Sequence, residues 1–289
     1  MYPQSFHYHA PRNLDEAIGL LEEHGMDAKL LAGGHSLIPT MKLRLAGPGH
    51  LIDLKHLRSD LNYVRDEDDV VAIGGLTTHH ALESSDLIRE QLPILAQTAE
   101  AIGDVQVRNV GTLGGSLAHA DPAADYPASV LALEAEIVVQ GPDGRRTIPV
   151  EDFLFGLFTT DLGPEEVLVE IRVPKLPRGT GGHYEKFPHP ASGYAVCGAA
   201  AVVTQGDDGH VARCRLGLTG VADVGYRATT VEEALEGQPW SDDRVEQAVQ
   251  SAVADVEPMG DYYASGEYRA QLARVYARWA LQRAWANAQ

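Results

Sequence analysis

The pattern of apolar and polar positions divides the chain into three regions of different periodicity. The first region, residues 1–55, alternates short apolar runs with a stretch at helical spacing that begins after Asn13 and stops at Gly25. Strands are predicted over 6–8, 28–31 and 50–54, and a helical turn over 39–43. This region therefore predicts a small unit in which strands and helices alternate.

The second region, residues 56–176, combines several short strands with helices whose starts are marked by threonine, proline and aspartate. Strands are predicted over 61–64, 70–73, 137–140, 145–150 and 167–173, the third and fourth forming a hairpin around a Gly-Pro-Asp-Gly turn. Helices are predicted from Pro93 to Ile102 and from Asp121-Pro122, as N-cap and first helical residue, to Leu133.

Prolines and glycines between residues 174 and 182 interrupt the pattern and mark a boundary. The third region, residues 177–289, begins with strands predicted over 184–187, 194–204 and 211–218 and continues with helices. The last helix, 265–287, carries an apolar stripe that is predicted to face a core, made of Leu272, Tyr276, Trp279 and Ala280.

Composition restricts the possible functions. The chain is 44% hydrophobic and 22% charged, which is ordinary for a globular protein, and its formal net charge of −18 disfavours nucleic acid as a partner. No stretch of 18 apolar residues occurs, and the residues after Met1 show no basic and apolar leader. We therefore expect no transmembrane segment and a cytoplasmic location.

The metal-binding residue types give no convincing pattern. Cys197 and Cys214 are the only cysteines, too few for an iron–sulfur cluster, and are expected to be buried on neighbouring strands. The histidine pairs 7/9 and 79/80 lack the helical i, i+4 spacing of a metalloenzyme site. We expect no metal site and assign no catalytic residue.

Two glycine pairs carry the candidate chemistry. Gly33-Gly34 and Gly114-Gly115 each follow an apolar run and precede a serine, Ser36 or Ser116. Glycine adopts positive φ at no steric cost, so successive backbone N–H groups can turn toward one anion. Two such loops suit the pyrophosphate of a dinucleotide, although either pair could be a simple turn in a chain with 29 glycines. No G-x-G-x-x-G, Walker or G-x-S-x-G motif offers another nucleotide or nucleophile site.

The segments around these pairs resemble, in order, the two flavin loops of a known subunit type. This is the FAD-binding medium subunit of the molybdenum hydroxylases, also called the xanthine dehydrogenase family. The resemblance is greatest to the medium subunit of aerobic carbon monoxide dehydrogenases. The resemblance covers essentially the whole chain and is carried by residues 32–42, 112–118, 121–125, 164–166, 184–186, 193–195 and 267–269. Ser116 departs from the asparagine of many relatives, and residues 187–192 replace a more basic stretch.

The resemblance implies an α+β fold. Its first part is a PCMH or vanillyl-alcohol-oxidase-type FAD-binding domain of two subdomains, residues 1–55 and 56–176. Residues 177–289 form a C-terminal domain of antiparallel sheet and helices, as in carbon monoxide dehydrogenase flavoproteins.

The resemblance also implies a cofactor site. Its pyrophosphate, ribityl and adenosine contacts would come from Leu30, Leu31, Ala32, Gly33, Gly34, His35, Ser36, Leu37, Thr112, Leu113, Gly114, Gly115 and Ser116. Asp125 would bind a polar part of the flavin, Ile102 and Leu162 would lie by the ring, Lys186 by its pyrimidine end, and Tyr194 would stack on it. Asp125 could instead be a first-turn helix acid, and Tyr194 an ordinary core residue.

The implied partners are a small subunit with two [2Fe–2S] clusters and a large molybdopterin subunit, assembled as a dimer of heterotrimers. Electrons would pass through FAD to quinone, NAD or oxygen. Two alternatives remain open, a self-contained flavin oxidase of the same superfamily and a dinucleotide-binding protein without redox function. The sequence does not identify a substrate among carbon monoxide, aldehydes, purines and N-heterocycles.

Overall fold

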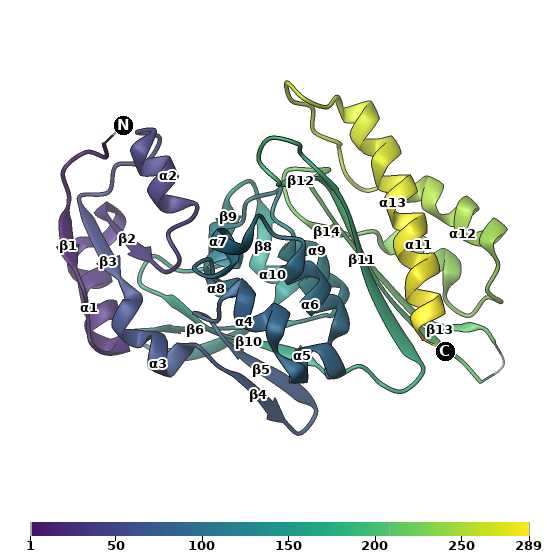
Figure 1. The fold of residues 1–289 in the computed structure, drawn as a ribbon, viewed down its shortest axis with the longest axis horizontal. Helices are drawn as coiled ribbons and strands as arrows, with labels where there is room; N and C mark the ends of the chain where they lie inside the picture. Colours follow the sequence, from purple (N-terminus) through teal and green to yellow (C-terminus); the bar gives the residue numbers. More distant parts are fainter. Residues whose placement is uncertain (1, 208, 289) are drawn as a thin grey trace.

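The computed structural model describes residues 2–207 and 209–288, arranged around three larger sheets that follow one another along the chain (Figure 1). The first region forms a parallel sheet in the order β1-β3-β2. Its elements are β1 (His7–His9), α1 (Leu14–His24), η1 (Gly25–Asp27), β2 (Ala28–Leu31), α2 (Leu37–Lys42) and β3 (His50–Asp53). As predicted, Asn13 caps α1 by accepting a hydrogen bond from the Glu16 N–H, and Gly25 ends the helix at φ +52°.

The second region forms a five-stranded antiparallel sheet in the order β4-β5-β10-β6-β7. The strands are β4 (Val64–Glu67), β5 (Val70–Gly74), β6 (Glu136–Gly141), β7 (Gly144–Pro149) and β10 (Val167–Pro174), with a small hairpin of β8 (Leu154–Gly156) and β9 (Thr159–Thr160). The helical segments are η2 (Leu54–Leu57), α3 (Arg58–Leu61), α4 (His79–Ser84), α5 (Asp86–Gln91), α6 (Pro93–Glu100), α7 (Val105–Arg108), α8 (Leu113–His119), α9 (Tyr126–Ala132) and α10 (Val150–Phe153).

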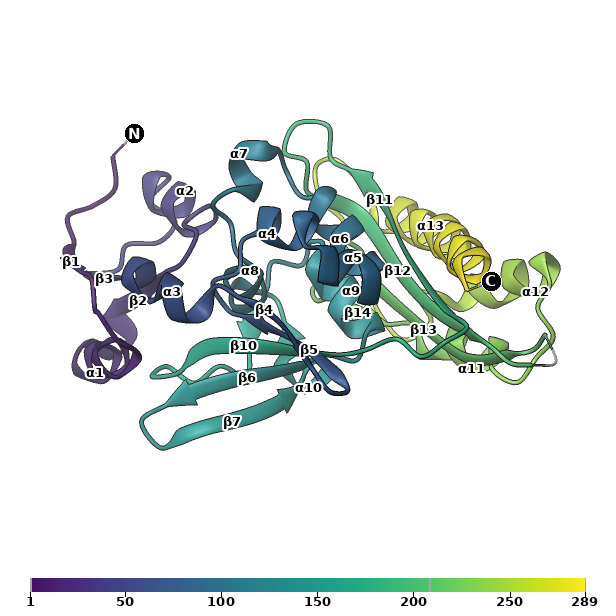
Figure 2. The same ribbon diagram turned by 60° about the horizontal axis from the view of Figure 1, so that its bottom comes forward.

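The third region forms an antiparallel sheet in the order β11-β12-β13-β14. Its elements are β11 (Thr180–Pro188), β12 (Ala195–Gln205), β13 (Val211–Thr219), β14 (Tyr226–Arg227), α11 (Thr229–Leu235), α12 (Asp242–Ala248), η3 (Val249–Ser251) and α13 (Gly266–Asn287). Figure 2 shows α13 along one face of this sheet and α6 and α9 of the second region against the other. The sheet is therefore covered on both faces.

Two apolar clusters hold the regions together. One joins α1 and β3 of the first region to Val138, Val167 and Val169 on the sheet of the second. Another joins the helices of the second region to Tyr184 and Ala200 on the sheet of the third. Neighbouring regions thus share buried surface, which fixes their relative positions.

Two predicted boundaries are wrong for local reasons. Leu61 ends helix α3, so the strand that was predicted over 61–64 begins only at Val64. Asp121 does not start a helix. Its carboxylate accepts a hydrogen bond from the Ala123 N–H at 2.9 Å, which closes a turn, and α9 begins at Tyr126.

The C-terminal helix packs through a narrower face than the sequence suggested. Leu272 and Ala280 are buried as predicted, together with a series of alanines, whereas Trp279 is 39% exposed. The small alanine side chains let α13 approach the sheet closely. No helix in the described part of the chain is long and apolar enough to cross a membrane, although α13 has 22 residues.

Arg269 fixes the start of α13 to the sheet. Its buried guanidinium donates to the carbonyls of Val196, at 2.8 Å, and Gly220, at 2.5 Å, and forms an ion pair with Asp261. Two buried carbonyl groups therefore share one side chain as a donor.

Replacing Arg269 by methionine should lower the free energy of unfolding by about 2 to 6 kcal/mol, because two buried carbonyls each lose a partner. Arg283→Met is the matched control on the same helix, since Arg283 is 62% exposed and its ion pair with Glu185 should contribute about 1 kcal/mol or less. Urea unfolding of both variants measures the difference. Equal losses would contradict the anchoring role of Arg269.

Candidate functional site

The first glycine pair lies in the connection between β2 and α2 and has the conformation expected of an anion-binding loop. Gly34 has φ +70°. Within residues 2–207 and 209–288, the backbone N–H groups of residues 33–37 have no hydrogen-bond acceptor on the chain. His35 shapes the loop, because its Nδ1 lies 3.0 Å from the Gly33 carbonyl oxygen. Five consecutive N–H groups are therefore free to bind a ligand.

The second glycine pair is not a loop, and the prediction of a second nest is wrong. Gly114 and Gly115 lie in the first turn of α8 without positive φ. The Gly114 N–H donates to the Gly75 carbonyl at 3.1 Å, and the Gly115 N–H donates to the hydroxyl of Thr112, the N-cap, at 3.1 Å. A Cβ at position 114 would lie 2.5 Å from the Gly75 oxygen, so this glycine permits close packing.

The structure nevertheless brings the two segments together. A Cβ at Gly33 would lie 2.7 Å from the Cα of Gly111, just before α8. A Cβ at Gly115 would lie 3.4 Å from the Cβ of Ala32. The predicted proximity is therefore present, but in the second segment the N–H groups of Leu113, Gly114, Gly115 and Ser116 already have acceptors on the chain.

Tyr194 brings the third region to the first loop. Burial raises the pKa of the Tyr194 phenol, and a hydrogen bond with the Ser36 side chain opposes that rise. The Tyr194 side chain is 40% exposed, so it is not an ordinary core residue. Its position is fixed by the next residue, because the Ala195 N–H donates to the Ala123 carbonyl at 3.0 Å.

Asp125 and Lys186 form a buried ion pair with each other. The Lys186 Nζ lies 2.8 Å from Asp125 Oδ1 and donates to the Ala101 carbonyl at 2.9 Å. Tyr184 donates its hydroxyl hydrogen to Asp125 Oδ1 at 2.6 Å. Burial raises the pKa of Asp125, and the Lys186 ammonium opposes that rise.

This pairing bears on both predicted roles. Asp125 is the N-cap residue of α9, but its side chain makes no capping hydrogen bond with that helix, so a simple capping acid does not describe it. The positive charge of Lys186 is compensated by a carboxylate at hydrogen-bond distance. A contact of either residue with flavin stays a prediction.

Ile102 and Leu162 are partly buried and pack against the same apolar core. Ile102 follows the Ala101 carbonyl that Lys186 binds, and Leu162 follows β9. The position of both residues beside a flavin ring stays a prediction.

The sequence reasoning missed two buried groups beneath the site. His79 lies under Gly111, where a Cβ would be 2.5 Å from the His79 Nε2, and its Nδ1 is 3.1 Å from the Tyr126 hydroxyl. Burial lowers the pKa of His79 to about 4, so its ring is neutral at pH 7. Tyr184 belongs to the resemblance block 184–186 and could have been identified, whereas no motif marks His79.

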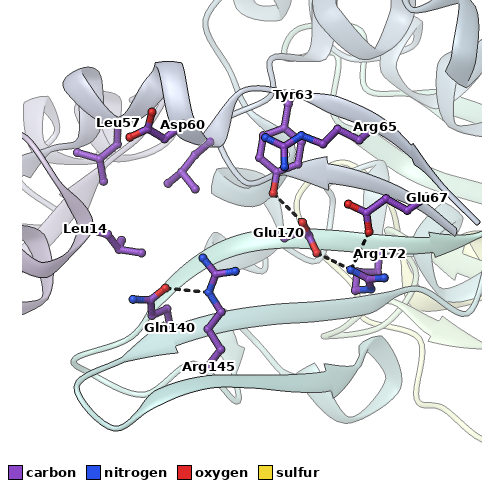
Figure 3. Close-up of a pocket in the computed structure, with 11 residues that line it drawn as sticks. Leu14, Leu57, Asp60, Tyr63, Arg65, Glu67, Gln140, Arg145, Glu170 and Arg172 are labelled. Atoms are coloured by element: carbon purple, nitrogen blue, oxygen red, sulfur yellow. Dashed lines mark hydrogen bonds and ion pairs between the residues drawn. The ribbon is translucent and has the colours of Figure 1, made fainter.

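A cavity of about 530 Å³ lies elsewhere, between the first region and the sheet of the second (Figure 3). Tyr63 donates to Glu170 at 2.7 Å there, and Arg172 forms ion pairs with Glu170 and Glu67. None of the residues predicted to bind the cofactor lines this cavity. It is therefore separate from the candidate flavin site.

The class of the protein follows from comparison with known proteins. Residues 4–176 match the family described as FAD binding domain in molybdopterin dehydrogenase, and residues 182–284 match the CO dehydrogenase flavoprotein C-terminal domain. The chain therefore belongs to the family of FAD-binding subunits of molybdenum hydroxylases. The α+β fold and the resemblance are confirmed.

Individual relatives match over nearly the whole chain. The carbon monoxide dehydrogenase medium chain of Hydrogenophaga pseudoflava is 42% identical over 287 residues, covering 99% of both chains. The 6-hydroxypseudooxynicotine dehydrogenase complex subunit alpha of Paenarthrobacter nicotinovorans is 37% identical, covering 98% of this chain and 96% of the relative. A solved carbon monoxide dehydrogenase from Hydrogenophaga pseudoflava, which lacks the Mo-pyranopterin moiety, has a TM-score of 0.96, with 44% identity and 99% of both chains covered.

Lys186→Met should lower the free energy of unfolding by about 3 to 5 kcal/mol, because it leaves the Asp125 carboxylate buried without a cation. The double variant Lys186→Met/Asp125→Asn should recover much of this loss, since an amide carries no charge. Arg278→Met is the control, because it breaks an ion pair with Glu246 in which the two side chains are 36% and 50% exposed. It should lower the free energy of unfolding by about 1 kcal/mol or less. Urea unfolding measures all three, and additive losses in the double variant would refute the coupling.

Proposed function

We propose that this chain is the FAD-binding electron-transfer subunit of a molybdenum hydroxylase similar to carbon monoxide dehydrogenase. The observation that carries the proposal is the row of free N–H groups on residues 33–37, in a chain whose family is defined by FAD binding. The chain has 23 basic and 41 acidic residues, so few cations are available for a phosphate ligand. Backbone N–H groups can bind a pyrophosphate without them.

In this proposal, two loop segments and three further residues of the chain would contact FAD. Residues 30–37 would hold the pyrophosphate and the adjoining ribityl and adenosine parts, with the Ser36 hydroxyl beside the free N–H groups. Residues 112–116 would form the opposite wall, where Ser116 offers a hydroxyl and Gly114 lets α8 pack closely against Gly75. Tyr194 would stack on the ring, with Ile102 and Leu162 at its edges.

The Asp125–Lys186 pair would orient the polar end of the ring. Lys186 has three N–H donors, and the structure gives it the Asp125 carboxylate and the Ala101 carbonyl as partners. These partners hold the ammonium in one place while burial excludes water. FAD, when bound, supplies the redox chemistry that amino-acid side chains lack.

Electrons would reach this chain from another polypeptide. Two [2Fe–2S] clusters need about eight cysteine ligands at four per cluster, whereas Cys197 and Cys214 are both buried on adjacent strands. Burial raises the pKa of the Cys197 thiol to about 12, which opposes formation of the thiolate that a metal requires. The proposed partners are a small [2Fe–2S] subunit and a large molybdopterin subunit, arranged as a dimer of heterotrimers.

The substrate of the complex would be oxidised on the large subunit. Relatives at 42% and 37% identity carry names that refer to carbon monoxide and to a pseudooxynicotine, so similarity of this subunit does not select a substrate. Quinone, NAD or oxygen would accept the electrons from this chain. A self-contained oxidase is less well supported, because the residues that the structure describes include none placed as a substrate base.

Gly34→Ala should weaken FAD binding. Position 34 has φ +70°, which strains an alanine, and the new Cβ would lie 2.7 Å from the Ile38 side chain, so the row of N–H groups must move. Loss of one charge-assisted hydrogen bond, about 1.5 to 3 kcal/mol, corresponds to roughly a ten- to hundredfold rise in Kd. Gly237→Ala is the matched control, with φ +73° and open space around the Cβ. Flavin titration of both variants measures Kd, and an equal Kd would refute the loop assignment.

The purified chain with FAD should oxidise no substrate alone. Mixing it with a reduced [2Fe–2S] subunit should bleach its flavin absorbance, whereas carbon monoxide, aldehydes or purines alone should not. Stopped-flow absorbance measures both. Substrate turnover by the single chain would refute electron transfer and favour the self-contained oxidase.

A further inference from the structure

Three histidines from separate elements meet in the first region. His9 lies in β1, His24 is the last residue of α1, and His50 is the first residue of β3. One ring nitrogen of each lies within 4.8 Å of the others. The His9 Nε2 and the His50 Nδ1 are 3.0 Å apart, and the rings of His24 and His50 stack with centroids 3.6 Å apart.

The fold explains why these rings meet. Strands β1 and β3 are parallel neighbours, and His7 is paired with His50. His9 lies two residues further along β1, on the same face as His7, so its ring can reach the His50 ring. The first residue of β2, Ala28, is paired with His50 in the sheet. The end of α1, which comes shortly before Ala28 in the chain, therefore lies near His50. The cluster is therefore held by three elements and does not depend on a flexible loop.

The spacing of the ring nitrogens suits a metal ion that prefers nitrogen ligands, and the stacked rings of His24 and His50, whose planes differ by 25°, would turn about their side-chain torsions to direct one nitrogen each at the ion. A Zn–N distance of about 2.0–2.1 Å places two ligands of a tetrahedral ion roughly 3.3 Å apart, close to the His9–His50 separation and within the span of the three nitrogens. All three histidines are partly exposed, so an ion can enter and water can complete the coordination.

Among the residues that the structure describes, no strong ion pair holds these rings, and His9 and His50 are at hydrogen-bond distance from each other. The nearest carboxylate contact of these rings is His24 with Glu23, at 4.0 Å, and Asp27 accepts a hydrogen bond from the Gly49 N–H at 2.9 Å.

We propose that His9, His24 and His50 form a binding site for a divalent transition-metal ion, with Zn²⁺ as the ion that suits three imidazoles and water. The bound ion would fasten the edge strand β1 to α1 and β3. The cluster lies beside the start of β2, whereas the loop of residues 33–37 follows the end of β2. The proposed ion is therefore separate from the cofactor loop, and its role would be structural. This site departs from the expectation of no metal site, which considered only ligands at helical spacing.

The test uses the full chain with FAD, without a histidine tag and after treatment with a chelator. Calorimetric titration with Zn²⁺ should show one ion bound per chain, and Co²⁺ should give the visible absorption bands of a tetrahedral nitrogen site. Zn²⁺ should also raise the Tm, because an ion that binds only the folded state stabilises it.

His50→Gln and His24→Gln should each weaken Zn²⁺ binding at least tenfold and abolish the rise in Tm. His56→Gln, at an exposed histidine in η2 of the same region, is the matched control and should bind like the unmodified chain. Flavin content and circular dichroism verify that each variant is folded. If His50→Gln does not fold, His24→Gln alone provides the test. No saturable binding, or binding that neither substitution changes, would overturn the proposal.

Discussion

Close contact between glycine backbones determines how the first two regions meet. Gly33 of the first region lies against Gly111 of the second, and within the second region Gly114 lies against Gly75, in each case at distances where a Cβ would collide with main-chain atoms. The hydrogen bond from the Gly114 N–H to the Gly75 carbonyl fixes α8 against the end of β5. The first loop packs against the segment that enters α8, so its shape depends on these contacts.

The third region is tied to the same place by buried polar groups. Lys186 and Tyr184 on β11 reach Asp125 at the start of α9, and Tyr194 before β12 reaches Ser36 in the first loop. A buried ion pair contributes little net stability, but breaking it is costly. The pair therefore defines one relative position of the sheet and α9 more than it strengthens the fold.

Much of the fold could be predicted from the sequence, because local signals and tertiary packing agree there. The Asn13 cap, the stop at Gly25 and the strands on which Cys197 and Cys214 lie follow from residue type and periodicity. The second glycine pair was misread, because glycine in a motif can serve close helix packing as well as positive φ. Only the acceptors for its N–H groups, which come from Gly75 and Thr112, distinguish the two uses.

The parts of the site that lie within one continuous segment could be predicted from the sequence. Side-chain pairings between distant segments could not. The adjacency of the two glycine segments was predicted, but the pairing of Asp125 with Lys186 was not, since these residues meet only when β11 packs beside α9. The histidine cluster shows the same limit, because its three rings come from β1, α1 and β3. A rule based on helical spacing cannot detect ligands that a parallel sheet assembles.

The acidity of the chain gives the first loop its importance. With a net charge of −18, a phosphate ligand meets a repulsive field unless partial positive charge is concentrated at one point. Aligned N–H groups supply that charge without adding a titratable group, so their effect does not change with pH. The only lysine predicted for the site is already paired with Asp125, so in the proposed complex the backbone of residues 33–37 would bind the pyrophosphate. Affinity for the cofactor should consequently depend on loop geometry more than on any single side chain.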